Sequence, residues 1–249
     1  MYAFRRFIRQ SLLPSNLPKL RRVLTIFLCV ALIPLTSCLD IKEKITLKRN
    51  GSGTYSIKVD MEEMMSMLQG FMSQDETGEL NIFDTMDSTL REQVIQLRSV
   101  PGLTNVSHQS ENFTFRISYD FDKVETLNEA LSSGGSLGGN MGGLLPENIE
   151  TGPAYHWTRK SFERRQESIQ DFFEESDDDE MASMMSMAKM MMAEATYQIV
   201  YDMPGRVKKM TNSEAKLSSD KKTVSLDLAL LDILEGNAEL GNKITFKKR

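Results

Sequence analysis

The residue with the clearest potential for chemistry is Cys38, in the stretch Leu35-Thr36-Ser37-Cys38. It follows an uncharged apolar segment, residues 23–35, which itself follows six basic residues and no acidic residue in positions 1–22. A basic region, a short apolar region and small residues before a cleavage point form the order of a secretory signal. The apolar segment has 13 residues, fewer than the roughly 20 that a membrane-spanning helix needs. We therefore predict a signal segment over residues 1–37.

The four residues that end in Cys38 resemble the bacterial lipobox, in which an apolar residue and two small residues precede the cysteine. This resemblance implies that the leader is cut before Cys38, that its thiol carries diacylglycerol and that its new amino group is acylated. Cys29 leaves with the leader, so the mature chain has 249 − 37 = 212 residues and no free thiol. Leu39 stands where aspartate retains enteric lipoproteins in the inner membrane, which favours the outer membrane.

The charge of the mature chain limits its partners. Removing the six leader cations leaves 30 − 6 = 24 basic residues against 35 acidic ones, so the formal charge changes from −5 to −11. Such a chain is unsuited to nucleic acid and to broad adhesion on anionic headgroups. We expect attachment to the membrane to come from the lipid on Cys38, and we expect no nucleic-acid partner.

Two methionine-rich segments could also do chemistry. "MEEMMSM" at 61–67 recurs as "MASMMSM" at 181–187, and on a helix each set of methionines lies within one arc. The preferred interpretation is core packing, because methionine fills irregular gaps. An adaptable face for a lipid or partner and a Cu(I) site made of thioethers are the alternatives. Because no histidine or cysteine joins these methionines, we assign no metal ligand.

Little in the sequence favours catalysis. The histidines are His108 and His156, and no G-x-S-x-G, H-E-x-x-H or phosphate-loop motif is present. His156, between Tyr155 and Trp157, is more typical of a residue on a strand surface or of a packing residue than of a general base. The acidic run Glu174–Glu180 lacks the glycine turn and distal glutamate of a calcium loop. We predict a protein that is not an enzyme and needs no cofactor.

The elements expected to position these residues begin with a hairpin at Ile45–Val59, whose turn contains Asn50-Gly51-Ser52-Gly53. Hydrophobic periodicity predicts three helices and one strand in the rest of the first half. These are helices at Met61–Met72, Ser88–Ser99 and Lys123–Leu131, and a strand at Phe113–Phe121.

The second half begins with a glycine-rich tract at 132–150, for which we predict a flexible loop. The same periodicity predicts strands at Tyr155–Phe162, Tyr197–Asp202, Val224–Leu230 and Ile244–Phe246, with a methionine-rich helix at Asp178–Ala193. Strands and helices do not alternate regularly, which argues against a parallel sheet. We predict a single α+β envelope domain over 38–249, with a mainly antiparallel sheet and the methionine-rich helices packed on one face.

Turn and strand signatures in this chain resemble the LppM-type envelope lipoprotein domain and related lipoproteins of Bacteroidota. They are "NGSGTYSIKV", "SVPGLTNV", "FTFRISYDF", "YQIVYDMPGRV" and "LSSDKKTVSLDLALLDI", which cover most of 39–131 and 195–249. The resemblance implies an α+β envelope domain and a lipid or phosphoinositide as ligand, and no binding residue can be carried over. Proteins of this type often end in a transmembrane helix, whereas this sequence ends in "ITFKKR".

These observations favour a lipid-anchored envelope protein that binds a lipid-like ligand or another envelope component. The alternative is a periplasmic protein that handles Cu(I) through its methionine-rich helices.

Overall fold

The first hairpin of the described chain organises the larger sheet. Strand β1 (Asp40–Leu47) pairs antiparallel with β2 (Gly53–Asp60), and the register sets Ile45 opposite Tyr55. Alternate residues of both strands are buried, as expected for a sheet with one covered face. Gly51 in the turn has a φ of 89°, which glycine adopts without steric cost. The predicted hairpin is confirmed, although β1 begins at Asp40 rather than Ile45.

The computed structural model describes residues 39–71, 82–135, 154–165, 186, 189–190 and 192–247. All of them belong to one compact unit, Ser37–Arg249. The predicted signal segment 1–37 and Cys38 lie outside the described residues, as does the acidic run Glu174–Glu180. Of the methionine-rich helix predicted at 178–193, only Ser186, Lys189, Met190 and Met192 are described as helical.

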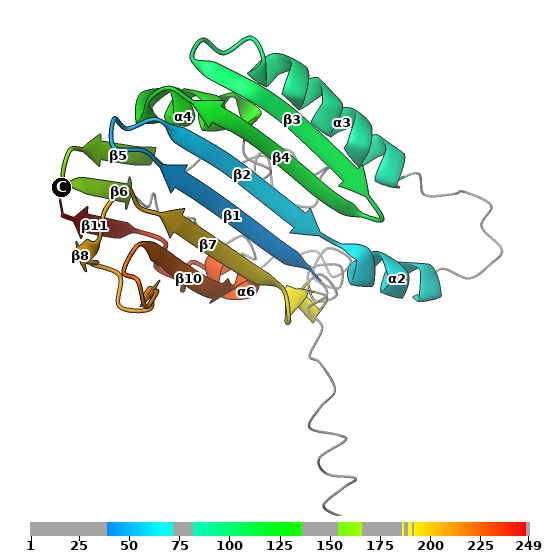
Figure 1. Ribbon diagram of the computed structural model, residues 1–249. Helices are drawn as coiled ribbons and strands as arrows, with labels where there is room; N and C mark the ends of the chain where they lie inside the picture. Colours follow the sequence, from blue (N-terminus) through cyan, green and yellow to red (C-terminus); the bar gives the residue numbers. More distant parts are fainter. Residues whose placement is uncertain are drawn as a thin grey trace, which may run out of the picture. The chain divides into compact units, whose positions relative to one another are not determined.

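The larger sheet of the described chain has the spatial order β3-β4-β2-β1-β7-β10-β9 (Figure 1). The strands not yet introduced are β3 (Leu103–Glu111), β4 (Thr114–Phe121), β7 (Thr196–Asp202), β9 (Lys216–Leu217) and β10 (Thr223–Ala229). Strands β1 and β7 are parallel, whereas the other neighbours pair antiparallel. The sheet is therefore mainly antiparallel, as predicted.

A smaller antiparallel sheet has the order β5-β6-β11-β8. Its strands are β5 (Ala154–Thr158), β6 (Ser161–Arg165), β8 (Val207–Lys209) and β11 (Asn242–Phe246). The turn of the first hairpin reaches this second sheet, because a Cβ placed on Gly51 would lie 2.7 Å from Nε1 of Trp157 on β5. The two sheets are thus in contact at this turn.

The described helices are α2 (Glu62–Phe71), α3 (Ile82–Leu97), α4 (Val124–Ala130) and α6 (Leu230–Leu234), with a π-helical turn, η1 (Leu131–Gly135), directly after α4. Helix α3 lies along β3 and β4, and α4 contacts β4 and β5 (Figure 1). The combination of strands and separate helices gives the predicted α+β fold. That both methionine-rich helices pack on one face of the sheet stays a prediction.

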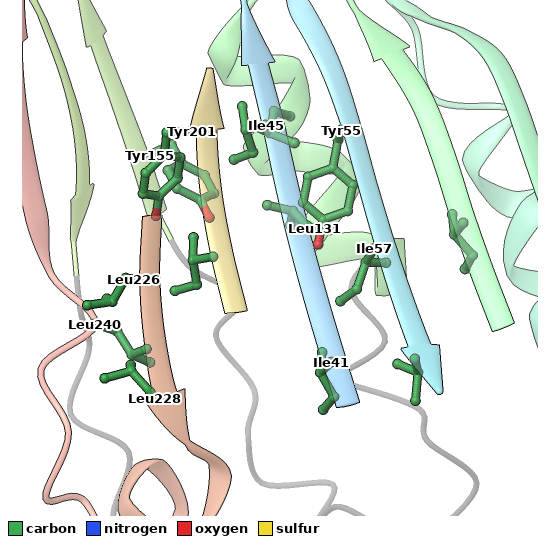
Figure 2. Packing of buried hydrophobic residues seen from close by; sticks show 14 of the residues in the cluster. Ile41, Ile45, Tyr55, Ile57, Leu131, Tyr155, Tyr201, Leu226, Leu228 and Leu240 are labelled. Carbon is green, nitrogen blue, oxygen red and sulfur yellow. The ribbon is translucent and has the colours of Figure 1, made fainter. Parts of the chain in front are cut away.

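One core joins the inward face of the larger sheet to the smaller sheet and the helices. Figure 2 shows Ile45 of β1, Tyr55 of β2 and Tyr201 of β7 on that face, with Tyr155 of β5 beside Tyr201. Leu131, the first residue of η1, belongs to the same buried cluster. The opposite face of the sheet carries exposed charged residues such as Lys42 and Lys44, so the sheet has one covered and one solvated face.

Several sequence-based boundaries in the first half are wrong. Strand β3 is not predicted, because its only apolar residues are Leu103 and Val106 and its pairing with β4 shifts register nearby. The strand predicted from Phe113 begins at Thr114, since Asn112 and Phe113 have φ of 48° and 57° and form the β3–β4 turn. Helix α3 begins at Ile82, earlier than the predicted Ser88.

The second half also departs from prediction in places. The single strand predicted at Tyr155–Phe162 is the hairpin β5–β6. Oγ1 of Thr158 accepts backbone hydrogen bonds from Lys160 and Ser161 at 3.3 and 3.0 Å, which stabilises a turn without glycine or proline. Residues 132–135 of the predicted flexible loop form η1, and residues 136–150 of that loop lie outside the described chain.

Candidate functional site

Glu43 is a charged residue where its strand otherwise buries apolar side chains. The neighbouring inward positions of β1 are Ile41 and Ile45, and Glu43 itself is 1% exposed. The register places Ile57 of β2 and Ile199 of β7 directly opposite it. An ionised carboxylate in such apolar surroundings is stable only when it is paired and hydrogen-bonded.

Three side chains supply those partners. Arg164 donates from Nη1 to Oε2 of Glu43 at 2.9 Å, and this guanidinium side chain is 5% exposed. The hydroxyl of Tyr197 donates to Oε2 at 2.7 Å, and that of Tyr155 donates to Oε1 at 2.6 Å. Tyr197 lies on β7 of the larger sheet, whereas Tyr155 and Arg164 lie on β5 and β6 of the smaller one. The cluster therefore links the two sheets.

Aromatic rings surround this ion pair. The ring of Tyr155 stacks on that of Phe162 with centroids 5.2 Å apart, and Phe162 meets the ring of Tyr201 at 5.4 Å. The guanidinium carbon of Arg164 lies 5.7 Å from the centre of the Tyr155 ring, within the range of a cation–π contact. Figure 2 shows the hydroxyls of Tyr155 and Tyr201 both pointing along the strands toward the end that carries Ile41.

Every tyrosine after Tyr2 belongs to this cluster. They are Tyr55, Tyr119, Tyr155, Tyr197 and Tyr201. Burial is the largest cause that raises the pKa of each hydroxyl, and the negative charge of Glu43 also raises it in all five. These hydroxyls are therefore protonated near neutral pH and can donate hydrogen bonds.

The ion pair holds both of its members in the charged state. Burial alone would raise the pKa of Glu43, but the charge of Arg164 and the hydrogen bonds from Tyr155, Tyr197 and Arg164 together keep that pKa below its usual value. For Arg164, burial acts to lower the pKa, but the charge of Glu43 outweighs it and the pKa is raised. The charges cancel, so the pair adds no net charge to the core.

Two hydroxyls in this part of the core make no well-aligned hydrogen bond. Among the described residues, the Oη atoms of Tyr119 and Tyr201 are buried without one. Burial raises the pKa of Tyr201, but its hydroxyl lies against Arg164 and Tyr155, which act to lower that pKa. Both residues lie in the row of the sheet next to that of Glu43, because Tyr119 pairs with Tyr55, Tyr55 with Ile45, and Ile45 with Tyr201. Tyr55 and Tyr119 also stack with ring centroids 5.0 Å apart. A buried polar atom without a partner is unfavourable and calls for an explanation.

The cluster is not arranged for acid–base catalysis. A general acid or base works best with a pKa near the ambient pH. Here the pKa of Glu43 is lowered, and the pKa values of the tyrosines are raised. The pKa values of Glu43 and of the tyrosines are therefore both shifted away from neutral pH.

A second polar cluster has the residue types of a catalytic triad without its geometry. Asp87 of α3 accepts from Ser110 and lies 3.0 Å from Nε2 of His108, both on β3. The serine therefore bonds the aspartate and not the histidine, whereas a nucleophilic serine must bond its base. Burial would raise the pKa of Asp87, but hydrogen bonds from Ser110, His108 and Arg91 hold it far below its usual value. This cluster joins α3 to β3.

The structure places some of the residues singled out from the sequence. His156 is exposed on β5, as its position in the sequence indicates. Met61, Met64 and Met65 are buried members of the core, whereas the methionines at 181, 184, 185, 187 and 191 lie outside the described residues. No group of three or more His, Cys, Asp or Glu side chains in the described ranges is placed to hold a metal ion.

Sequence reasoning missed the cluster around Glu43, although a signal for it exists. In "IKEKI" the glutamate occupies the inward position between Ile41 and Ile45, and in "FERR" Arg164 stands two residues after the buried Phe162. The predicted hairpin begins at Ile45, which leaves Glu43 outside it. A charged residue at an inward-facing position of a strand, between two apolar inward-facing residues, is the pattern that predicts such a site.

No model of a known protein family matches this chain, and no curated protein matches it. Among solved structures, the chain is similar to the NMR structure of the folded domain of the LppM protein from Mycobacterium tuberculosis. The TM-score is 0.42 and the sequence identity 10%, over 85% of this chain and 90% of that one. A relationship to lipoproteins of Bacteroidota stays a prediction. No helix in the described part of the chain is both long and apolar enough to cross a membrane.

Proposed function

We propose that this protein is a lipoprotein of the bacterial envelope, held to a membrane by lipid on Cys38. The observation that carries this proposal is the closeness in sequence of the lipobox-like residues to the folded domain. Leu39, directly after Cys38, is 4% exposed, and its carbonyl oxygen accepts a hydrogen bond from the backbone N–H of Thr196 at 2.9 Å. A cut before Cys38 thus removes residues 1–37 and leaves every described residue of the domain in place.

The domain binds a lipid-like ligand or another envelope component and does not catalyse a reaction. Binding is the part of this proposal that follows from the resemblance of the turn and strand signatures in 39–131 and 195–249 to the LppM-type domain. The absence of catalysis is supported by the pKa directions of Glu43 and the tyrosines. It is also supported by the serine–aspartate bond in the second cluster.

The membrane is the outer one, because Leu39 follows the candidate lipidated cysteine. The alternative role in copper handling has less support, since Met61, Met64 and Met65 lie among apolar side chains of the core, where methionine commonly serves as packing.

The test of lipidation compares the wild type with Cys38→Ala in cells given a labelled fatty acid, followed by separation of the two membranes. The wild type is expected to carry label and to fractionate with the outer membrane, whereas Cys38→Ala carries no label. Cys29→Ala is the matched control and keeps the label, because Cys29 lies within the predicted leader. Normal labelling of Cys38→Ala would disprove the lipid anchor.

A further inference from the structure

The turns at one end of the two sheets carry a concentration of positive charge. We call this end the basic pole, and it consists of residues 48–52, 158–160, 203–206 and 218–222 together with Lys247. Its exposed cations are Lys48, Arg49, Arg159, Lys160, Arg206, Lys221, Lys222 and Lys247, and its only acidic side chain is that of Asp220. The basic pole thus has a formal charge of 8 − 1 = +7, although the whole sequence from Cys38 onward has a charge of −11.

Contacts between the turns hold these cations at the same end of the domain. Gly51 approaches the ring of Trp157, which stacks on that of Phe246 with centroids 5.4 Å apart. Strands β1, β7 and β11 all point toward this end (Figure 1). Backbone hydrogen bonds from N–H to carbonyl oxygen join the other turns: Phe246 to Lys160 at 3.0 Å, Lys247 to Arg206 at 2.9 Å, Val207 to Lys221 at 2.7 Å and Met203 to Lys222 at 2.8 Å.

The cations of the basic pole are not neutralised within the domain. Among the described residues, none of the eight forms an ion pair. By contrast, Lys44, Lys58 and Lys216 on the solvated face of the larger sheet each pair with an aspartate at 2.9, 2.8 and 3.0 Å. Like charges gathered at one end repel one another and destabilise the compact state. An anionic partner would remove this repulsion.

The proposed lipid on Cys38 decides which way the basic pole faces. Leu39, the residue after Cys38, directly precedes β1, and the basic pole follows the last residue of that strand. Strand β1 has eight residues, so its two ends are about 25 Å apart at about 3.3 Å per residue. Exposed charges are largely screened beyond about 8 Å at physiological ionic strength. The basic pole is therefore too far from the proposed anchor to act on the same membrane.

The distribution of charge favours an acidic protein segment over a second membrane surface. Outside the basic pole, the sequence from Cys38 onward has 24 − 8 = 16 basic residues against 35 − 1 = 34 acidic ones. A broad anionic surface would also meet this acidic remainder, whereas a narrow segment can contact the basic pole alone. The exposed large apolar side chains of the described chain are Ile95, Met190 and Leu217. None belongs to the basic pole, so the pole has no such side chain to insert into a bilayer.

We propose that the basic pole docks an acidic segment of another envelope protein, on the side of the domain away from the anchored end. The inference rests on the proposed binding of an envelope component and specifies the chemistry of that component. Carboxylates of the partner pair with the cations of the four turns. Complementary charge of this kind speeds association, and its effect weakens as the salt concentration rises.

The test measures the binding of fluorescein-labelled decaglutamate to the full-length protein in detergent at low salt. The variant Arg159→Gln/Lys160→Gln/Lys222→Gln removes three exposed cations of the basic pole, and we expect it to bind the peptide about tenfold more weakly. Its melting temperature is expected to be equal or higher, because repulsion between like charges is reduced.

The matched control is Lys42→Gln/Arg116→Gln/Arg165→Gln, which removes three exposed cations outside the basic pole. It changes the net charge by the same amount, and we expect it to change the affinity for decaglutamate by less than about twofold. Equal weakening in the two variants would overturn the proposal, because net charge and not the basic pole would then govern binding. Absence of binding by the wild type would overturn it as well.

Vesicles of dioleoylphosphatidylglycerol test a membrane as the alternative partner of the basic pole. We expect Cys38→Ala, which has no lipid anchor, not to bind them. Vesicle binding by Cys38→Ala that is lost when the three replacements in the basic pole are added would overturn the proposal in favour of a membrane surface. The mass of the intact protein reports acylation of Cys38 separately, so a failure of the anchor and a failure of the basic pole give different results.

Discussion

At the scale of single residues, a carboxylate and a guanidinium removed from water hold the two sheets together. Glu43 is 1% and Arg164 5% exposed, and tyrosines from both sheets complete the hydrogen bonding of the carboxylate. Breaking such a pair is costly, because the remaining charge stays buried without its partner. The cluster therefore affects stability mainly because removal of one charged member leaves the other buried and unpaired.

Glu43→Gln is expected to destabilise the protein by about 3–5 kcal/mol, because it leaves the charge of Arg164 unpaired. Lys44→Gln is the matched control on the next residue of β1, where Lys44 pairs with Asp202 on the exposed face at 2.9 Å. An exposed pair of this kind contributes less than about 1 kcal/mol. Urea denaturation measures both changes, and equal losses in the two variants would contradict the role given to the buried pair.

The stability that Glu43 contributes depends on pH. Its pKa in the folded protein is lower than the usual value of 4.5, so the contribution is complete above that value and is lost as the pH falls through the folded-state pKa. We expect the difference in unfolding free energy between the wild type and Glu43→Gln to be constant from neutral pH down to about pH 5. At lower pH the difference is expected to shrink. A difference that grows on acidification would contradict the assigned direction.

At the scale of elements, a regular alternation of apolar and polar residues predicts a strand well, and a weak alternation does not. The strand that contains Phe115, Ile117 and Tyr119 follows from its regular apolar positions, whereas the edge strand β3 has too few apolar residues to be recognised. The turn at Thr158 depends on a side-chain oxygen and not on glycine. The residue types in this segment therefore did not indicate a turn. The site at Glu43 depends on the contact of Glu43 on β1 with Arg164 on β6. That contact is determined only by tertiary packing.

The turn between β1 and β2 requires glycine at position 51. Its φ is 89°, and an added Cβ would lie 2.7 Å from Nε1 of Trp157. Gly51→Ala is therefore expected to cost more than about 1–2 kcal/mol, the backbone penalty alone. Arg49→Ala, an exposed neighbour, is expected to change stability by no more than about 0.5 kcal/mol. Thermal unfolding compares the two, and a neutral Gly51→Ala would show that the turn can relax.

The first methionine-rich segment is tested by the triple replacement of Met61, Met64 and Met65 with leucine. These side chains are buried in the core, and leucine conserves apolar volume, so stability is expected to change by about 1–2 kcal/mol at most. Copper titration of both proteins gives the second measurement. Stoichiometric Cu(I) binding by the wild type that disappears in the triple variant would favour the copper role, because leucine offers no ligand.

At the scale of the whole molecule, the formal charge and the proposed lipid anchor have separate roles. The sequence from Cys38 onward has a formal charge of 24 − 35 = −11, so electrostatic attraction to anionic lipid does not explain attachment to a membrane. The lipid proposed on Cys38 supplies the attachment instead. Because Leu39 is already packed against the start of β7, the proposed lipid would be joined to the domain without a spacer on that side.

The wild type is therefore expected to stay with the membrane fraction when the salt is raised to about 1 M, where the Debye length falls to about 3 Å. Detergent is expected to release it, because acyl chains are held by the apolar interior of the bilayer and not by charge. Cys38→Ala, purified in parallel, is expected to show no binding to vesicles of anionic phospholipid at low salt. Release of the wild type by salt alone would mean that a charged surface, and not a lipid on Cys38, holds this domain at the membrane.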